Sequence, residues 1–254
     1  MSTADTTIAT ELVDRLAVAD RIVFFTGAGV SAESGVATFR ATDGLWSKFR
    51  PEELANVEAF LANPQMVWEW YQARRSVMLE AKPNDGHRAM VDFETTHEQV
   101  TIITQNIDGL HAEAGSRDVI ELHGNLRKNF CRDCERRYDD VALLSTEEVQ
   151  RCDDCNGLIR PDVVWFGEML PQEAVARAEV ESRSADVFLS IGTSSVVWPA
   201  AGLPLLAVER GAFVVEINPD ETPLSRHATT SIRGTSGQVL PELFARVREK
   251  MATG

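Results

Sequence analysis

The chain of 254 residues lacks the features of several large protein classes. It has no internal repeat and no apolar run near the roughly 20 residues that a membrane-spanning helix needs. Residues 1–5 lack the basic start and apolar stretch of a secretory signal. We therefore expect a cytoplasmic protein that binds no membrane.

Basic residues are scarce relative to acidic ones. Lys and Arg number 25 against 39 Asp and Glu, so the formal net charge is −14. A surface of this sign repels nucleic acid and anionic membranes, so we expect no direct nucleic-acid binding. It attracts cationic segments such as lysine-rich peptides, although an acidic surface can also serve only to keep a protein soluble. Both interpretations stay open.

Cysteine is scarce as well, and all four cysteines occur as two CxxC pairs. Cys131 pairs with Cys134 and Cys152 with Cys155, and residues 135–151 lie between the pairs. This spacing is typical of a zinc site in which two turns each offer two thiolates to one ion. Four thiolates leave no open coordination position, so a structural role is expected. No cysteine is left over for a disulfide, which suits a reducing compartment.

A zinc ribbon that binds nucleic acid is the alternative interpretation of these pairs. The residues around the first pair mix both signs of charge: Arg127, Lys128, Arg132, Asp133, Glu135, Arg136, Arg137, Asp139 and Asp140. Basic residues matched by acidic ones argue against a phosphate-binding patch.

Short apolar runs that end in polar or glycine-bearing loops indicate buried parallel strands. The sequence predicts strands at 21–25, 100–104, 187–191 and 212–217, and helices at 6–19 and 172–181. This alternation predicts an α/β fold with a doubly wound, Rossmann-like parallel sheet. Ligands of such sheets bind at the carboxyl ends of the strands.

Two stretches interrupt the alternation. Residues 45–81 combine a helical pattern with a concentration of aromatic residues, and residues 127–160 carry the cysteines. We predict that the helical insertion and the zinc-binding module form a smaller domain. The larger, Rossmann-like domain would then consist of residues 1–44, 82–126 and 161–254, with a substrate cleft between the two domains.

Three loops after predicted strands have the composition of a dinucleotide site. The Gly-Ala-Gly loop at 27–29 places backbone N–H groups at a helix start, where phosphate oxygens are stabilised, although a plain tight turn is the alternative. The Gly-Thr-Ser loop at 192–194 adds two hydroxyls, and the Glu-Ile-Asn segment at 216–218 adds a polar side chain for a ribose. Three such loops at one sheet edge favour a dinucleotide ligand.

Asn106 and Asp108 follow the strand predicted at 100–104, and in an extended stretch their side chains point to the same side. An amide beside a carboxylate can bind a carboxamide such as that of nicotinamide, donating to its oxygen and accepting from its amino group. The alternative is an Asx turn that caps the following helix, which explains one of the two residues more easily than both.

His123 stands out among the five histidines because it precedes the first cysteine pair and so lies at the predicted domain junction. A neutral histidine in a cleft is a usual general base. His87, His97 and His227 lie in polar segments and are expected to be solvated, whereas His111 fits a structural hydrogen-bonding role equally well.

Together these motifs resemble those of the sirtuins, a family of NAD-dependent protein-lysine deacylases. The resemblance covers about residues 20–245 and rests on the order and spacing of the whole set. The set consists of Gly27-Ala28-Gly29-Val30-Ser31, Gly35-Val36-Ala37-Thr38-Phe39-Arg40, TQNIDGLH at 104–111, His123-Gly124, the CxxC pairs, RPDVVWFGE at 160–168, and the loops at 192–194 and 216–218.

The resemblance implies that NAD is consumed as a co-substrate and that the four cysteines hold one structural Zn²⁺. His123 would be the catalytic base that deprotonates a ribose hydroxyl, and Asn106 would be the second catalytic residue. The implied cofactor-binding residues are Gly27, Ala28, Gly29, Ser31, Phe39, Arg40, Trp46, Gln105, Asn106, Ile107, Asp108, Gly192, Thr193, Ser194, Asn218 and Ser236.

The resemblance also implies a peptide site. The substrate peptide would add as a strand to one segment of the motif at 160–168, and the loop around 196–197 would flank it on the other side. The segment consists of Val164, Trp165, Phe166 and Gly167.

One departure narrows the class. Many deacetylases of the family have Asp where this chain has Thr38, and Thr is like the branch that removes acidic acyl groups. Tyr71 and Arg74 agree, because at spacing i, i+3 they share one helix face, as the Tyr-x-x-Arg pair of the desuccinylase and demalonylase branch does. An arginine beside a phenol suits a distal carboxylate. The alternative is a surface arginine beside a half-buried tyrosine.

The sequence therefore predicts NAD-dependent removal of succinyl, malonyl and acetyl groups from lysines of proteins or peptides, with release of nicotinamide and O-acyl-ADP-ribose. Two alternatives remain. One is protein mono-ADP-ribosyl transfer in the same NAD cleft. The other is a non-catalytic, NAD-sensing interaction module that contains zinc.

Overall fold

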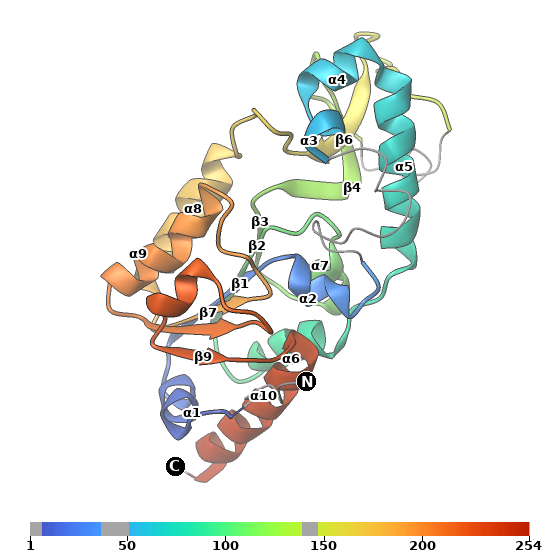
Figure 1. Cartoon of the computed structure of the whole chain (residues 1–254). Helices are drawn as coiled ribbons and strands as arrows, with labels where there is room; N and C mark the ends of the chain where they lie inside the picture. The colour runs from blue at the N-terminus through green and yellow to red at the C-terminus, as the bar shows by residue number, and fades with distance from the viewer. Residues whose placement is uncertain (1–6, 37–50, 139–146, 254) are drawn as a thin grey trace.

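The computed structural model describes residues 7–36, 51–138 and 147–253 (Figure 1). Its larger sheet has six strands in the order β3-β2-β1-β7-β8-β9, and every neighbouring pair is parallel. The strands are β1 Arg21–Thr26, β2 Gln99–Thr104, β3 Val119–Glu121, β7 Val187–Ile191, β8 Phe213–Ile217 and β9 Thr230–Ile232. This arrangement confirms the predicted α/β fold with a doubly wound parallel sheet.

Helices cover both faces of this sheet, which is why its central strands are apolar throughout. One face packs against α1 (Thr10–Ala17), α6 (Asp85–Phe93) and α10 (Ser236–Thr253). The other packs against α8 (Gln172–Ser184) and α9 (Leu203–Glu209). Adjacent residues of β1 divide between the two faces. Phe24 contacts Phe93 at 5.4 Å between ring centroids, and Phe25 contacts Phe188 at 6.0 Å.

The predicted element boundaries differ little from the observed ones. The strand at 187–191 agrees at both ends, and the other three strands differ by one residue at one end. The helix predicted at 172–181 runs on to Ser184. Helix α1 is shorter than the predicted 6–19, although its apolar residues Leu12 and Leu16 are buried as the helical spacing predicts.

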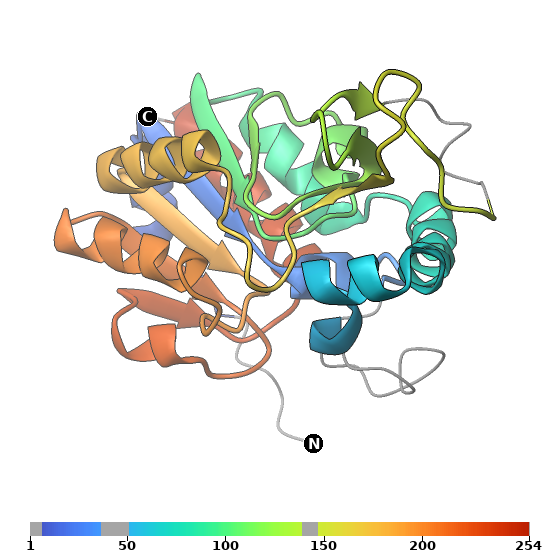
Figure 2. The same ribbon diagram turned by 90° about the horizontal axis from the view of Figure 1, so that it is seen from above.

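A smaller antiparallel sheet has the order β5-β4-β6. Its strands are β4 Gly124–Cys131, β5 Arg137–Tyr138 and β6 Ile159–Val163. The helices α3 (Pro51–Leu54), α4 (Val57–Ala62) and α5 (Pro64–Glu80) lie beside this sheet (Figure 2). Leu126 and Trp165 share one buried cluster with Phe60 and Tyr71. The aromatic residues of the insertion thus form a core with the segment around the cysteines.

Local signals in the sequence explain where the insertion's helices begin. The side chain of Asn56 accepts a hydrogen bond from Ala59 N and caps α4. That of Asn63 accepts from Met66 N and caps α5, and Pro64 occupies the first turn of that helix. Each side chain satisfies a backbone donor that the first helical turn leaves without an intrahelical partner.

Four short elements complete the description. They are α2 Ala28–Ala32, α7 Leu110–Ala114, η3 Ala200–Gly202 and η4 Pro223–Arg226. His123 lies between β3 of the large sheet and β4 of the small one, at the predicted junction. Among the described residues, no helix has the length and apolar character that crossing a membrane requires.

Candidate active site

A cleft of about 1270 Å³ opens at the carboxyl ends of β1, β2, β7 and β8. It brings together the site residues predicted within the described part of the chain, apart from the cysteines. Those lining it are Gly27, Ala28, Gly29, Ser31, Tyr71, Arg74, Gln105, Asn106, Ile107, Asp108, His123, Val164, Trp165, Phe166, Gly167, Gly192, Thr193, Ser194, Asn218 and Ser236. Thr38, Phe39, Arg40 and Trp46 lie outside the described residues.

Two glycine loops form one wall of the cleft and pack directly on each other. Gly29 N donates to Gly192 O at 2.8 Å. A Cβ atom at Gly29 would lie 2.8 Å from Gly192 Cα, and one at Gly27 would lie 2.8 Å from Thr193 Cβ. Only glycine permits this approach, so the loops at 27–29 and 192–194 meet backbone to backbone. This packing explains the glycines at these positions, and the phosphate-binding role of the motif stays a prediction.

The amide of Asn106 is fixed by its neighbours. Its Nδ2 donates to Gly27 O at 3.0 Å and to Ser31 Oγ at 3.1 Å, and the side chain is buried. The backbone N–H of Asn106 donates to Thr104 Oγ1 at 3.0 Å. These bonds hold the side chain in one orientation at the wall of the cleft.

Asp108 is buried beside Asn106 and also bonds to Ser31. Its Oδ2 accepts from Ser31 Oγ at 2.7 Å, and its Oδ1 accepts from Leu110 N at 2.9 Å at the start of α7. The Asx-turn alternative therefore holds for Asp108 and not for Asn106. Burial raises the pKa of the Asp108 carboxyl, and hydrogen bonds from Leu110 and Ser31 oppose that shift.

A hydrogen bond sets the tautomer of His123. Its Nδ1 lies 2.9 Å from Gln105 O, and since a carbonyl only accepts, Nδ1 carries the proton. The other ring nitrogen, Nε2, is then an acceptor. Burial lowers the pKa of His123, which keeps the imidazole neutral near pH 7. The ring can therefore receive a proton in the cleft.

The His-Gly pair has a steric reason. Gly124 has φ +79°, and a Cβ atom there would lie 2.1 Å from Asp162 O. Any other residue would push β4 away from β6 at the point where the chain leaves His123. Glycine at this position therefore lets the small sheet close directly beside the histidine.

Two of the predicted histidine environments are wrong. His87 and His97 are buried and bonded inside the protein. His87 Nδ1 accepts a hydrogen bond from Asn84 N in the capping box of α6. His97 Nε2 lies 2.9 Å from Leu16 O. His227 is exposed, as expected. His111 is buried and its Nε2 lies 2.9 Å from Thr26 Oγ1, which agrees with the structural alternative.

Tyr71 and Arg74 of α5 line the cleft together. Tyr71 is 1% exposed and so is not half-buried, whereas Arg74 is partly exposed, and the role of the pair stays a prediction. Its hydroxyl accepts a hydrogen bond from Trp165 Nε1 at 2.8 Å, and its own hydrogen remains to be donated. The Arg74 guanidinium lies 4.8 Å from the ring centroid of Trp70, and burial lowers the pKa of this group.

The segment at 164–167 already uses one of its edges. Val164 N donates to His123 O at 3.0 Å, and Phe166 N donates to Ala55 O at 2.8 Å. The opposite side is also occupied at Trp165, because Trp165 N donates to Glu168 Oε2 at 2.8 Å and Trp165 O accepts from Glu168 N at 2.9 Å. Gly167, with φ +87°, turns the chain there, so the segment is not a free strand edge.

Arg160 and Glu168 hold this segment in shape, a role that the sequence analysis did not assign. Arg160 Nη2 donates to Glu168 Oε2 at 2.9 Å and to Val163 O at 2.8 Å. Glu168 Oε2 also accepts from Trp165 N at 2.8 Å, and the guanidinium stacks 3.3 Å from the Trp165 ring centroid. The sequence feature that could have predicted this role is the pair of opposite charges at the first and last positions of the 160–168 motif.

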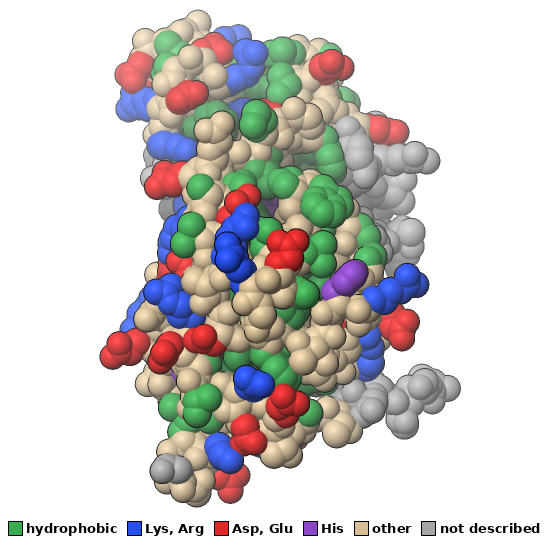
Figure 3. Space-filling model, turned by 90° about the vertical axis from the view of Figure 1, so that its left-hand side faces the viewer, with side chains coloured by type: hydrophobic (Ala, Val, Ile, Leu, Met, Phe, Trp, Pro, Cys, Tyr) green, Lys and Arg blue, Asp and Glu red, His purple; other side chains and the backbone are tan. Residues whose placement is uncertain are grey.

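The exposed apolar lining of the cleft, which we call its mouth, consists of Phe166, Met169, Val196, Val197 and Trp198. The acidic residues of the whole lining are Glu33, the buried Asp108, Glu168, Glu179, Asp220 and Glu221, whereas Arg74 is the one Arg or Lys among the described lining residues. Figure 3 shows hydrophobic side chains gathered among charged ones on the α8 and α9 side of the molecule.

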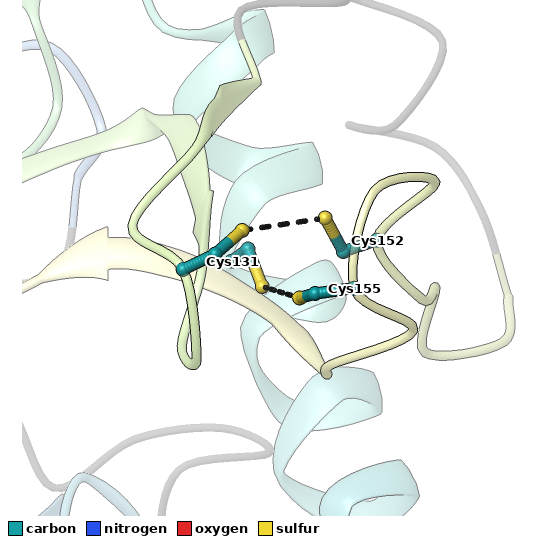
Figure 4. A group of neighbouring side chains, drawn as sticks. Cys131, Cys152 and Cys155 are labelled. Atoms are coloured by element: carbon teal, nitrogen blue, oxygen red, sulfur yellow. Dashed lines mark hydrogen bonds between the residues drawn. The ribbon is translucent and has the colours of Figure 1, made fainter.

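The four cysteines converge, and their Sγ atoms all lie within 4.8 Å of one another (Figure 4). Cys131 Sγ is 3.4 Å from Cys155 Sγ, and Cys134 Sγ is 3.6 Å from Cys152 Sγ. Four thiolates around Zn²⁺ at about 2.3 Å would lie about 3.8 Å apart, so the cluster fits this ion. None of the four cysteines lines the cleft, which agrees with a structural role.

Comparison with known proteins gives consistent matches. The sequence profile of the Sir2 family matches residues 27–199. The chain is 50% identical to the NAD-dependent protein deacylase of Aquifex aeolicus (strain VF5), over 90% of this chain and 96% of that protein. It is 47% identical to NAD-dependent protein deacylase 1 of Archaeoglobus fulgidus, over 95% of this chain and 99% of that protein.

Solved structures give the same result. A complex of a Sir2 homologue with NAD has a TM-score of 0.93 at 46% identity, over 98% of both chains. A Sir2 structure described as holding a deacetylated p53 peptide and 3′-O-acetyl-ADP-ribose has a TM-score of 0.82 at 38% identity, over 94% of this chain and 97% of that chain.

Proposed function

The chain belongs to the Sir2 family and is an NAD-dependent protein deacylase, and we propose that it removes succinyl and malonyl groups, besides acetyl groups, from protein lysines. The products would be nicotinamide and O-acyl-ADP-ribose. The observation that carries the acidic-acyl proposal is the pair Tyr71 and Arg74, which faces the cleft from one side of α5.

The chemistry of this pair suits a carboxylate at the end of an acyl chain. Arg74 offers a cationic fork, and Tyr71 offers a hydroxyl hydrogen because its oxygen already accepts from Trp165. The nearby acidic residues of the cleft do not provide such donors. An acetyl group has no distal carboxylate, so its binding would not depend on these two donors.

The NAD site that we propose follows the sheet edge. The glycine loops at 27–29 and 192–194 would hold the diphosphate, and Asn218 and Ser236 would lie at the adenosine end. Asp108 would lie at the carboxamide of nicotinamide. Asn106 would contact the nicotinamide ribose, because its Nδ2 hydrogens are already donated to Gly27 O and Ser31 Oγ. Bound NAD supplies an electrophilic sugar carbon whose bond to nicotinamide breaks. The walls of the cleft would hold the acyl oxygen against that carbon, which is catalysis by positioning.

His123 would act as the base. Its Nδ1 proton is committed to Gln105 O, so Nε2 would accept the proton of a ribose hydroxyl. A neutral base held in position supports a catalytic role, and it argues against the alternative of a non-catalytic module that only senses NAD. Mono-ADP-ribosyl transfer would instead leave the adenine of NAD attached to protein.

The substrates would be acyl-lysine segments with apolar and basic neighbours. The apolar residues at the mouth can cover an extended peptide on both sides, and the acidic lining favours flanking Lys or Arg. The peptide would lie along the segment at 164–167, which lines the cleft.

Replacing Arg74 tests the acidic-acyl proposal. Arg74→Met should lower kcat/KM for a succinyl-lysine peptide by about 10- to 100-fold, because one charge-assisted hydrogen bond is lost, and should change the acetyl-lysine value by less than about threefold. Arg74→Lys is the matched control, since it keeps the charge and should retain part of the succinyl activity. Equal losses on both peptides would contradict the proposal.

A further inference from the structure

Two segments that line the cleft carry Asn218 and Ser236, the residues proposed for the adenosine end. They are residues 217–223, which begin at the last residue of β8, and residues 234–236, which end at the first residue of α10. Both line the cleft, whereas Glu216 and Arg233, the residues next to them, do not. Glu216 is 1% exposed.

The Glu216 carboxylate gathers several donors in the protein interior. Its Oε2 accepts from Arg233 Nη1 at 2.9 Å and from Ser225 Oγ at 2.5 Å, and its Oε1 accepts from Thr222 Oγ1. A buried carboxylate without a cationic partner is strongly destabilising, so Arg233 is what permits this arrangement. The result is a fixed turn at η4, beside the cleft.

The Arg233 guanidinium also binds the loop after β8. Its Nη1 donates to the backbone oxygen of Asp220 at 2.9 Å, and its Nη2 donates to the side chain of Ser225, at Oγ, at 3.1 Å. Asn218, at the start of that loop, donates through Nδ2 to Thr193 O at 2.8 Å. One guanidinium therefore connects the two cleft-lining segments, and the first of them is bonded to the loop at 192–194.

We infer that Arg233 and Glu216 form a positioning pair that preorganises the adenosine end of the NAD site. The inference rests on the proposed NAD site. Among the described residues, the side-chain hydrogen bonds of the pair to other residues reach positions 218–231, so their loss would act on adenosine binding and not on the base or the acyl pocket. If this part of the cleft is ordered before NAD binds, the free energy of binding includes no entropic cost for ordering it.

Arg233→Gln tests the pair in the full-length, zinc-loaded protein. Calorimetry with ADP-ribose should give a Kd about tenfold higher than that of the wild type, and the KM for NAD should rise by about the same factor. The kcat at saturating NAD and the KM for the acyl peptide should stay within about twofold, because the residues at the other end of the cleft are unchanged. Arg233→Lys keeps the charge beside Glu216 and should recover part of the ADP-ribose affinity.

Arg117→Gln is the matched control. Arg117 Nε pairs with the buried Glu94 at 2.9 Å, and neither residue lines the cleft. This variant should lose stability without losing ADP-ribose affinity. A folded Arg233→Gln protein with the wild-type Kd for ADP-ribose would overturn the inference. The inference would also be overturned if both variants lost ADP-ribose affinity in proportion to the fall in their melting temperatures. A wild-type protein that binds ADP-ribose but deacylates no peptide would instead contradict the proposed function alone.

Discussion

At the residue scale, the proposed chemistry depends on the protonation state of His123. Its Nδ1–H bond to Gln105 O leaves Nε2 as the acceptor, and burial lowers its pKa from the ordinary value of about 6.5. A lowered pKa means that the ring stays neutral, and so able to accept a proton, at a pH where a solvated histidine is partly protonated.

The pH dependence of activity follows with a definite sign. Because the base works in its neutral form and burial lowers its pKa, the midpoint of the acid limb of kcat/KM should lie below the ordinary histidine value of about 6.5. A pH profile with an acetyl-lysine peptide checks this. His123→Ala should lower kcat by about 10²- to 10⁴-fold at every pH while the melting temperature changes little. An acid limb centred above pH 7 would contradict the assignment of His123 as a buried base.

Single residues were predicted best where chemistry and chain position agree. Asn106, Asp108 and His123 were predicted from their residue types after a strand or at a junction, and all three line the cleft. His87 and His97 were misjudged because polar sequence neighbours describe a segment's composition, whereas burial depends on helix packing that brings in distant residues such as Leu16. The partnership of Glu216 and Arg233 likewise joins residues whose pairing only the fold reveals.

At the element scale, the small sheet depends on the cysteines. Cys131 ends β4, and the second pair lies just before β6, so the cluster fastens the two strands whose other ends lie beside His123 and the segment at 164–167. Tyr138 of β5 donates through its hydroxyl to Cys152 Sγ at 3.1 Å, which brings the third strand to the same point. Metal binding should therefore be part of the folding energy of this sheet.

Removing zinc tests this dependence. A strong chelator should abolish hydrogen-exchange protection in β4 and β6 well before it affects β1, β2 or β7, since the large sheet has its own hydrophobic cores. Cys131→Ser should reproduce that pattern without chelator, and adding chelator to it should change nothing more. Protection that survives full loss of the metal would contradict a structural role for zinc in the small sheet.

Elements were predicted well wherever one local rule decides them. Apolar runs followed by glycine or polar loops gave the four predicted strands to within one residue at either end, because both faces of the sheet are buried. The strands β3, β4, β5, β6 and β9 were not predicted. Strands β3, β5 and β9 span three residues or fewer, and β4 and β6 lack a continuous apolar run because they mix polar and charged residues with apolar ones.

At the scale of the whole molecule, we propose that the division into two domains holds as predicted from the sequence. Support comes from the hydrophobic clusters, since α3, α4 and α5 share one cluster with β4 and β6, while two others cover the faces of the large sheet. The cleft is lined by residues of both parts, including Arg74 from the insertion and Asn218 from the large sheet's edge. The sequence predicted a cleft between these parts because two stretches, at 45–81 and 127–160, interrupt the alternation of strands and helices.

The overall charge acts at this scale too. The chain has a formal net charge of −14, and the described lining of the cleft has six acidic residues and one arginine. A field of this sign favours basic substrate segments and makes their capture sensitive to salt. In the proposed acyl pocket, Arg74 would be the cationic partner of a carboxylate that enters the cleft.

The most direct test of the account is the release of nicotinamide by the wild-type protein from NAD and one basic peptide that carries acetyl-, succinyl- or malonyl-lysine at the same position. We predict release with each peptide, equal in amount to the acyl-ADP-ribose formed, and a kcat/KM for succinyl- or malonyl-lysine that exceeds the acetyl-lysine value. Release with acetyl-lysine alone would contradict the acidic-acyl proposal. No release with any of the three would contradict the proposed chemistry of the cleft.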